Sequence, residues 1–327
     1  MDDIYASLND AIDQIFASNF KDFLHENLSV DRWVITSDFN FDSAGSQHDV
    51  FAFSLFPVKI GGIKETSEYI SGILSDDFKR TDRVNKARRN IINKIEVFSF
   101  VLLLQRPFKL LRSGDSGRDR VEIYHAIQSI LERAPTGKKG SFLGLSKLMT
   151  ESKKKNFSIK MMERILILSK MYALISDRLQ SITIVRQIYW LPDRDNLTTY
   201  CESAWWELAE IQLTDRLLQK ITRKMPAKIG IIRPNDIIQQ DKFDPLIRIP
   251  DYLAAAFSRW DVAANVILPP ADSKKKALGR YANVITHWFA GNPRIWVAQL
   301  RLEDDILRTR VLTGVRTKRR IRRASLN

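Results

Sequence analysis

Three aspartates stand at the ends of apolar segments, where metal-binding side chains are often placed. Asp38 follows the apolar residues 32–37, and Asp193 follows residues 183–192. Asp251 begins a segment with the composition of a packed helix. Carboxylates that end two buried strands and begin a helix can hold divalent cations, which prefer oxygen ligands. The pattern predicts a centre that cleaves phosphodiesters with the help of metal ions.

Each aspartate also has a purely structural alternative. Asp38 could begin an ordinary hairpin loop. Asp193 lies in the turn-prone sequence Leu-Pro-Asp-Arg-Asp, in which Asp195 is an alternative ligand. Asp251 could be a helix N-cap, a position that aspartate favours. The metal-site hypothesis therefore depends on the order of all three along the chain.

The segments between the aspartates predict how they are positioned. Five have strand composition, namely residues 32–40, 50–58, 96–105, 182–191 and 228–233. The first two are joined by a loop rich in Asp, Ser and Gly, which indicates a hairpin. Helical patterns cover residues 63–95, 197–220 and 251–264. This order predicts an α/β core with Asp38 and Asp193 at the carboxyl ends of strands, where open sheets usually place their sites.

The remaining segments are expected to be helical. They comprise an N-terminal segment (residues 1–27), an insertion in the core (about residues 111–180) and a C-terminal segment (residues 266–327) with a basic tail. Within the last of these, residues 275–289 and 294–313 are predicted helices. The predicted core spans residues 28–265.

The charge of the chain favours an anionic partner. Lys and Arg number 52 against 38 for Asp and Glu, so the net charge is +14. Nucleic acid is the commonest polyanion for such a protein, although a basic surface can also lack a partner. Phosphate contacts are predicted for the basic residues of the tail, which are Arg316, Lys318, Arg319, Arg320, Arg322 and Arg323. The alternative for this run is a solvated chain end.

Other classes of protein are disfavoured. Cys201 is the only cysteine, so an internal disulfide is excluded and a reducing compartment fits. The acidic start of the chain does not resemble a signal peptide, and no apolar run is long enough to span a bilayer. We therefore expect a cytoplasmic protein without a membrane partner.

Two short motifs carry a resemblance to a known family. They are the strand that ends in Asp38, with its hairpin partner, and the sequence Ile-Pro-Asp-Tyr-Leu-Ala-Ala-Ala around Asp251. Together they resemble a bacterial family known as a domain of unknown function, over most of residues 28–265. The chain departs from the family after Asp38, where Phe-Asn-Phe replaces Glu-Ser-Gly, and at Pro250 and Ala255, where the family usually has Ala and Gly.

The resemblance implies a ribonuclease H-like fold, which is a mixed sheet flanked by helices. Its active site would take one Asp from the first strand, one from the end of a later strand and one from a late helix. A further carboxylate is expected on an intervening helix, and Asp77 is the best candidate, ahead of Glu96 and Glu68.

The chemistry expected of such a site uses two Mg²⁺ or Mn²⁺ ions, about 3.5–4 Å apart and bridged by Asp38. Asp193 and Asp251 would each complete one coordination shell. The expected function is a metal-dependent nuclease acting on RNA or DNA, and the resemblance suggests mobile-element or antiviral defence. The alternative is a catalytically inactive nuclease fold that binds nucleic acid or a partner protein in a larger assembly.

Overall fold

The chain folds as two compact units. The computed structural model describes residues 18–59, 61–75, 85–110, 115–132, 142–219, 230–232, 243–268, 278–303, 306–312 and 322–323. The helical unit holds the described residues from 108 to 182 and from 194 to 219. The sheet unit holds those from 18 to 107, from 183 to 193 and from 230 onward.

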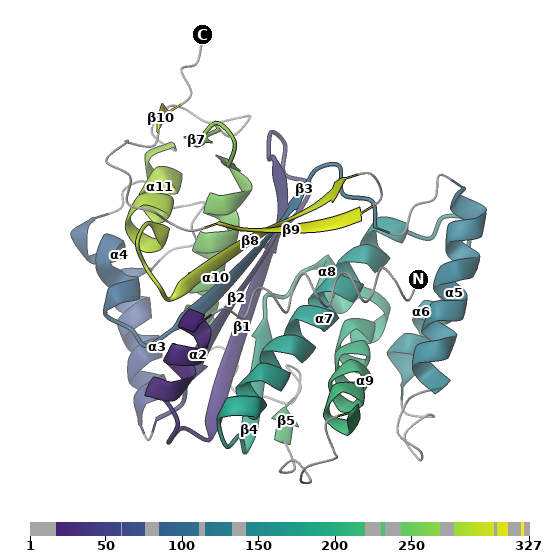
Figure 1. The fold of residues 1–327 in the computed structure, drawn as a ribbon, viewed down its shortest axis with the longest axis horizontal. Helices are drawn as coiled ribbons and strands as arrows, with labels where there is room; N and C mark the ends of the chain where they lie inside the picture. Colours follow the sequence, from purple (N-terminus) through teal and green to yellow (C-terminus); the bar gives the residue numbers. More distant parts are fainter. Residues whose placement is uncertain are drawn as a thin grey trace. The chain divides into compact units, whose positions relative to one another are not determined.

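The sheet unit is built on a seven-stranded sheet with the strand order β5-β4-β1-β2-β3-β8-β9 (Figure 1). Its strands are β1 (Arg32–Asn40), β2 (His48–Pro57), β3 (Phe98–Gln105), β4 (Gln187–Pro192), β5 (Gly230–Ile232), β8 (Ile295–Glu303) and β9 (Ile306–Leu312). β1, β2 and β3 are antiparallel neighbours, and β4 pairs in parallel with β1. β5 is parallel to β4, β8 is parallel to β3, and β9 is antiparallel to β8. The predicted α/β class is confirmed.

Helix α10 (Asp244–Ser258) lies across β1, β2 and β3 on one face of this sheet (Figure 1). Alternate strand residues such as Val34, Ala52 and Val101 share a buried apolar cluster with Tyr252 and Leu253 of the helix. The same layer contains α3 (Gly62–Ile73), α4 (Lys86–Asn90) and α11 (Leu278–Asn283), which continues as a π-helix (Val284–Phe289). Asp38 occupies the strand face that this layer covers, because it is two and four residues after Thr36 and Val34.

The short helix α2 (Ser18–Glu26) packs through aromatic rings on strands β1 and β3. The Phe20 ring lies 5.0 Å from that of Phe98, and the Phe23 ring lies 6.1 Å from that of Trp33, between centroids. Trp33 is one residue before Val34, so it belongs to the opposite face of the sheet from α10. The central strand β2 is buried along its whole length because both of its faces are covered.

The C-terminal part of the sheet unit differs from the sequence prediction. The sequence predicts a helix over residues 294–313, but they form β8 and β9, a hairpin added to the edge of β3. Residues 295–300 are all buried in β8, and a mostly apolar run that is buried on both sides has no period that separates a strand from a buried helix. Pairing with the distant strand β3 decides the outcome, so the prediction of a helical C-terminal segment is wrong for these residues.

A second, three-stranded sheet in the same unit has the order β10-β7-β6. It contains β6 (Trp260–Asp261), β7 (Val266–Ile267) and β10 (Arg322–Arg323). Two of the predicted phosphate-binding residues, Arg322 and Arg323, thus form backbone pairs with Val266 and Ile267. The other four, Arg316, Lys318, Arg319 and Arg320, lie outside the described residues.

The helical unit contains α5 (Ser116–Glu132), α6 (Leu143–Ser152), α7 (Ile159–Ile182), α8 (Asn196–Thr199), a 3₁₀ turn (Tyr200–Ser203) and α9 (Ala204–Gln219). α7 packs along α9, and α6 contacts both α5 and α9. Helices α8 and α9 therefore join the helices of the predicted insertion in one compact unit. None of the helices in the described part of the chain is long and apolar enough to cross a membrane.

Candidate carboxylate site

Asp38 lies inside strand β1, two residues before the strand ends. Its backbone pairs with that of Ala52 on β2, and only 8% of the residue is exposed. Its Oδ1 atom accepts a hydrogen bond from the N–H of Phe39 at 2.6 Å. Because the hairpin loop begins only after Asn40, the alternative of a loop-starting residue is wrong for Asp38.

Asp193 comes directly after β4, which runs parallel to β1 with Ser37 beside Pro192. The N–H of Asp193 donates to the carbonyl oxygen of Ser37 at 2.7 Å. This bond extends the parallel pairing by one residue beyond the end of β4. The bond brings Asp193 beside Asp38, although Asp193 comes 155 positions later in the chain.

Asp251 reaches the site from the middle of α10. The helix begins at Asp244, with a proline in its first turn, and not at Asp251 as the sequence predicts. Pro250 lies inside the helix, where its missing N–H costs one intrahelical hydrogen bond. The alternative of a helix N-cap is therefore wrong for Asp251, whose side chain instead forms a hydrogen bond with Asp38.

The three carboxyl groups interact electrostatically. Burial raises the pKa of the Asp38 carboxyl well above its usual value, and the negative charges of Asp251 and Asp193 raise it further. The hydrogen bond with Asp251 acts in the same direction, while the Phe39 N–H opposes it by favouring the ionised form. Asp38 is therefore held as a neutral acid under conditions in which an exposed aspartate is ionised.

Asp195, the alternative to Asp193, has a different role. It is the N-cap of α8, and its Oδ1 accepts hydrogen bonds from the N–H groups of Leu197 at 2.9 Å and Thr198 at 3.0 Å. The Thr198 hydroxyl in turn accepts from the Asp195 N–H, which completes a capping box. Asp195 belongs to the helical unit, whereas Asp193 acts on Asp38 in the sheet unit.

The donor set is chemically suited to a hard cation, because it consists of carboxylate oxygens. However, the described residues contain no group of three or more His, Cys, Asp or Glu side chains arranged to hold a metal ion. Asp38, Asp193 and Asp251 thus lie near one another without surrounding one cation-sized point. The contact between Asp38 and Asp251 is instead a hydrogen bond, which raises the pKa of the Asp38 carboxyl.

The predicted fourth carboxylate is not resolved by this geometry. Asp77 lies outside the described residues. Glu96 forms an ion pair with Lys59 at 2.7 Å, and Glu68 forms one with Lys64 at 3.7 Å. The carboxylates of Glu96 and Glu68 are therefore at least partly exposed, and each pairs with a lysine.

Two of the residues that follow Asp38 belong to an aromatic cluster. The rings of Phe39 and Phe41 stack with centroids 5.8 Å apart, and both contact the ring of Phe51 edge-on. Phe39 projects from the opposite face of β1 to Asp38, because the two residues are adjacent on the strand. Phe39 and Phe41 therefore pack together on the side of β1 away from Asp38.

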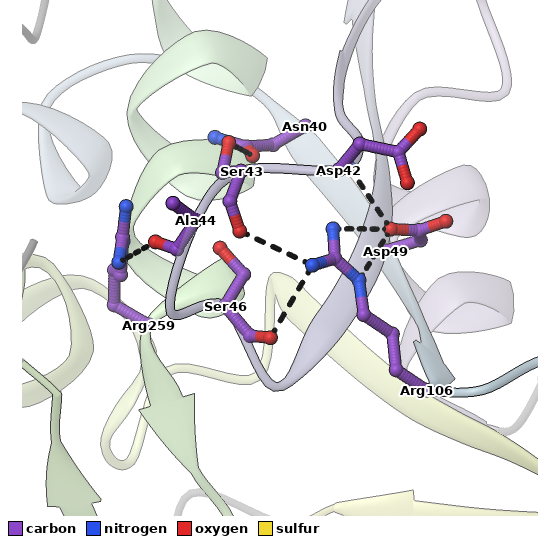
Figure 2. A network of polar contacts seen from close by, with 8 residues as sticks. All are labelled: Asn40, Asp42, Ser43, Ala44, Ser46, Asp49, Arg106 and Arg259. Carbon is purple, nitrogen blue, oxygen red and sulfur yellow. Dashed lines mark hydrogen bonds and ion pairs between the residues drawn. The ribbon is translucent and has the colours of Figure 1, made fainter. Parts of the chain in front are cut away.

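Two arginines that the sequence analysis did not single out fix the loop between β1 and β2 (Figure 2). Arg106 forms an ion pair with Asp49 at 2.5 Å and donates to the carbonyl of Ser43 at 3.1 Å. Arg259 donates to the carbonyl of Ala44 at 2.6 Å. Arg106 follows β3 and Arg259 follows α10, so only the tertiary arrangement shows that both act on the loop after Asn40.

No model of a known protein family matches this chain, and neither a curated protein nor a solved structure matches it.

Proposed function

We propose that the sheet unit is a ribonuclease H-like domain that hydrolyses phosphodiester bonds of nucleic acid with divalent metal ions. The observation that carries the proposal is the meeting of Asp38 from β1, Asp193 from the end of β4 and Asp251 from α10. These are the three kinds of element from which a ribonuclease H-like site takes its aspartates. They come from segments more than 50 residues apart, so local sequence cannot account for their proximity.

The strand arrangement supports the same proposal. The ribonuclease H-like fold that the resemblance implies is a mixed sheet flanked by helices. Here β1, β2 and β3 are antiparallel neighbours, and β4 and β5 follow in parallel on the other side of β1. Strands β8 and β9 would be additions to this core at the edge of β3.

Electrostatics indicate what the aspartates are suited to hold. Three acidic groups repel one another, and the repulsion is relieved either by a proton on Asp38 or by a cation. Asp38, Asp193 and Asp251 would hold Mg²⁺ or Mn²⁺, which in such sites activate water and stabilise the leaving oxygen. The chain itself contributes the carboxylates, and the hydrogen bond from the N–H of Phe39 keeps the Asp38 side chain oriented.

The substrate class follows from charge. A net charge of +14 attracts polyanions, and nucleic acid is the polyanion that contains phosphodiester bonds. The chemistry applies equally to RNA and DNA. A role in mobile-element or antiviral defence is part of the proposal only through the family resemblance.

A second candidate function is a nuclease fold that binds nucleic acid without cleaving it. The observation that favours it is the hydrogen bond between Asp38 and Asp251, together with the lack of a metal-type arrangement among the described residues. In that case the hydrogen bond between the two acids would join α10 to β1 without a metal ion.

Purified protein incubated with single-stranded RNA or DNA and Mn²⁺ distinguishes the two candidates. We expect cleavage that requires the metal and is lost in Asp38→Asn and in Asp251→Asn, each of which preserves side-chain shape. Asp195→Asn is the matched control, because asparagine caps helices as well as aspartate does. Binding that weakens with salt but gives no cleavage would establish the second candidate instead, and cleavage that survives in both site variants would refute the assignment of the site.

A further inference from the structure

Helix α10 and strand β1 run in the same direction and touch at two places along their length. Near the start of the helix, the Thr36 hydroxyl donates to the carbonyl of Leu246 at 3.4 Å. One step further along both elements, Asp38 is hydrogen bonded to Asp251. The first contact therefore fixes the register of the second.

The spacing of the two contacts agrees on both elements. Thr36 and Asp38 are two residues apart on a strand, which is about 6.7 Å. Leu246 and Asp251 are five residues apart on a helix, which is about 7.5 Å. When the Leu246 carbonyl accepts from Thr36, Asp251 therefore lies opposite Asp38, and the helix does not have to shift along the strand.

The Leu246 carbonyl requires an outside donor because of Pro250. In an α-helix this carbonyl would accept from the N–H of residue 250, four positions later, and proline has no N–H. Leu246 and Thr36 are both fully buried, so water is not an adequate substitute. The Thr36 hydroxyl supplies the Leu246 carbonyl with a donor in place of the N–H that Pro250 lacks.

The other end of α10 is tied to the same hairpin. The Ser258 carbonyl accepts from the N–H of Gln47 at 3.2 Å, and Arg259 donates to the Ala44 carbonyl (Figure 2). The helix is thus held against the β1–β2 hairpin on both sides of Asp251. Of these ties, only the one between Thr36 and Leu246 depends on a proline.

We infer that Thr36 and Pro250 are a positioning pair that holds α10 in register on β1 and thereby places Asp251 against Asp38. Pro250 removes the usual helical donor of the Leu246 carbonyl, and the Thr36 hydroxyl reaches that carbonyl when the helix has this position along the strand. The inference rests on the proposed function, since it concerns the placement of a metal-binding carboxylate. Neither residue touches the substrate, and both act through Asp251.

The test is a double-mutant cycle in the full-length chain, with Thr36→Val, Pro250→Ala and both together. Valine keeps the shape of threonine without the hydroxyl, and alanine restores the N–H at position 250. Unfolding by urea without metal is the first measurement. We expect Thr36→Val to destabilise the otherwise unmodified protein and to have little effect in a chain that already carries Pro250→Ala. Equal effects in both backgrounds would mean that the pair does not exist.

The second measurement is Mn²⁺ binding, followed by the electron paramagnetic resonance signal of the free ion. We expect Thr36→Val to weaken binding about tenfold, as loss of an orienting partner typically does. Thr36→Ser, which keeps the hydroxyl, should bind like the unmodified chain. The Thr36→Val and Pro250→Ala double variant should recover most of the affinity.

Ser54→Ala is the control for a purely structural effect. Ser54 is directly opposite Thr36 on β2, and its hydroxyl pairs with that of Ser99 at 2.8 Å rather than with α10. It should lose stability but keep Mn²⁺ affinity. If both hydroxyl variants weaken Mn²⁺ binding equally, or neither does, the positioning role is refuted. If the unmodified chain does not bind Mn²⁺, the proposed function fails, and the urea cycle still shows whether the pair exists.

Discussion

The carboxyl group of Asp38 on β1 is hydrogen bonded to that of Asp251 on α10, although Asp251 comes 213 positions after Asp38 in the chain. Two carboxyl groups can share a hydrogen bond only when one of them carries a proton. Asp38 is the buried partner and has its pKa raised, so it holds that proton. This pair connects the sheet to the helix that covers it and is the basis of the proposed site.

Replacement of Asp38 by asparagine should change how stability depends on pH. Because the pKa of Asp38 is raised in the folded state, the folded protein keeps a proton that the unfolded chain releases above about pH 4. This contribution to stability is present at low pH and is lost as pH rises through the raised pKa. Asp38→Asn stays neutral, so it should lack this decline and be more stable than the unmodified protein at pH 7. Urea unfolding from pH 4 to pH 8 measures the difference, and identical pH profiles would contradict the protonated state of Asp38.

Asp193 and Asp195 should differ in their effect on metal binding. Asp193→Asn removes a charge that acts on Asp38, and we expect it to weaken Mn²⁺ binding about tenfold or more. Asp195→Asn keeps a good helix cap and should leave both Mn²⁺ affinity and stability almost unchanged. Titration calorimetry of both variants tests this, and a larger loss in Asp195→Asn would reverse the assignment.

Arg259→Met should destabilise the protein by about 1–3 kcal/mol, because the Ala44 carbonyl would lose a charged donor. Arg294→Met is the matched control. Arg294 pairs with Glu26 at 3.3 Å, and both side chains are at least a third exposed, so its loss should cost less than about 1 kcal/mol. Chemical denaturation at pH 7 compares the two, and equal costs would show that the loop does not depend on Arg259.

Two glycines should respond to alanine in opposite directions. A Cβ atom at Gly144 would lie 2.8 Å from the carbonyl oxygen of Cys201, so Gly144→Ala should cost about 1–3 kcal/mol. A Cβ at Gly72 in α3 would have nothing within 4 Å, and Gly72→Ala should stabilise the protein by about 0.5–1 kcal/mol. Thermal unfolding of both variants gives the signs, and a neutral Gly144→Ala would mean that α6 can move away from Cys201.

His48 should make the folded state sensitive to acid. Burial is the main cause that lowers the pKa of the His48 ring to about 4. The charges of Arg301 and Arg106 act in the same direction, and those of Asp261 and Asp49 oppose them. The unfolded chain therefore binds a proton that the folded state rejects, and stability should fall by on the order of 3 kcal/mol as pH drops from about 6.5 to about 4.

His48→Gln tests this and should remove most of the loss, since glutamine does not titrate and can still bond to Gln299, which lies 2.8 Å from the His48 ring. An unchanged acid response in the variant would assign the effect to other groups. Nuclear magnetic resonance of the His48 ring protons reports its titration directly.

The sequence by itself determined the local elements around the site. β1 occupies residues 32–40, as predicted, because its run of β-branched and aromatic residues is flanked by a loop rich in Asp, Ser and Gly. The third strand and helix α9 are likewise visible in composition and period, whereas the helix predicted over residues 294–313 is the strand pair β8 and β9. The same patterns identify Asp38, Asp193 and Asp251, since acidic residues stand out at the ends of apolar segments.

Only the tertiary structure decided which of these residues meet and what role each has. Asp193 contacts the site and Asp195 caps a helix, although both follow the same strand. α10 begins at Asp244, before Pro250, and the carbonyl of Leu246 in its first turn accepts from the hydroxyl of Thr36 on a distant strand. β8 is a strand because β3 pairs with it, not because its own sequence excludes a helix. Hydrophobic period and turn chemistry describe a residue's immediate neighbours, whereas register, pKa and shared hydrogen bonds depend on contacts between segments far apart in the chain.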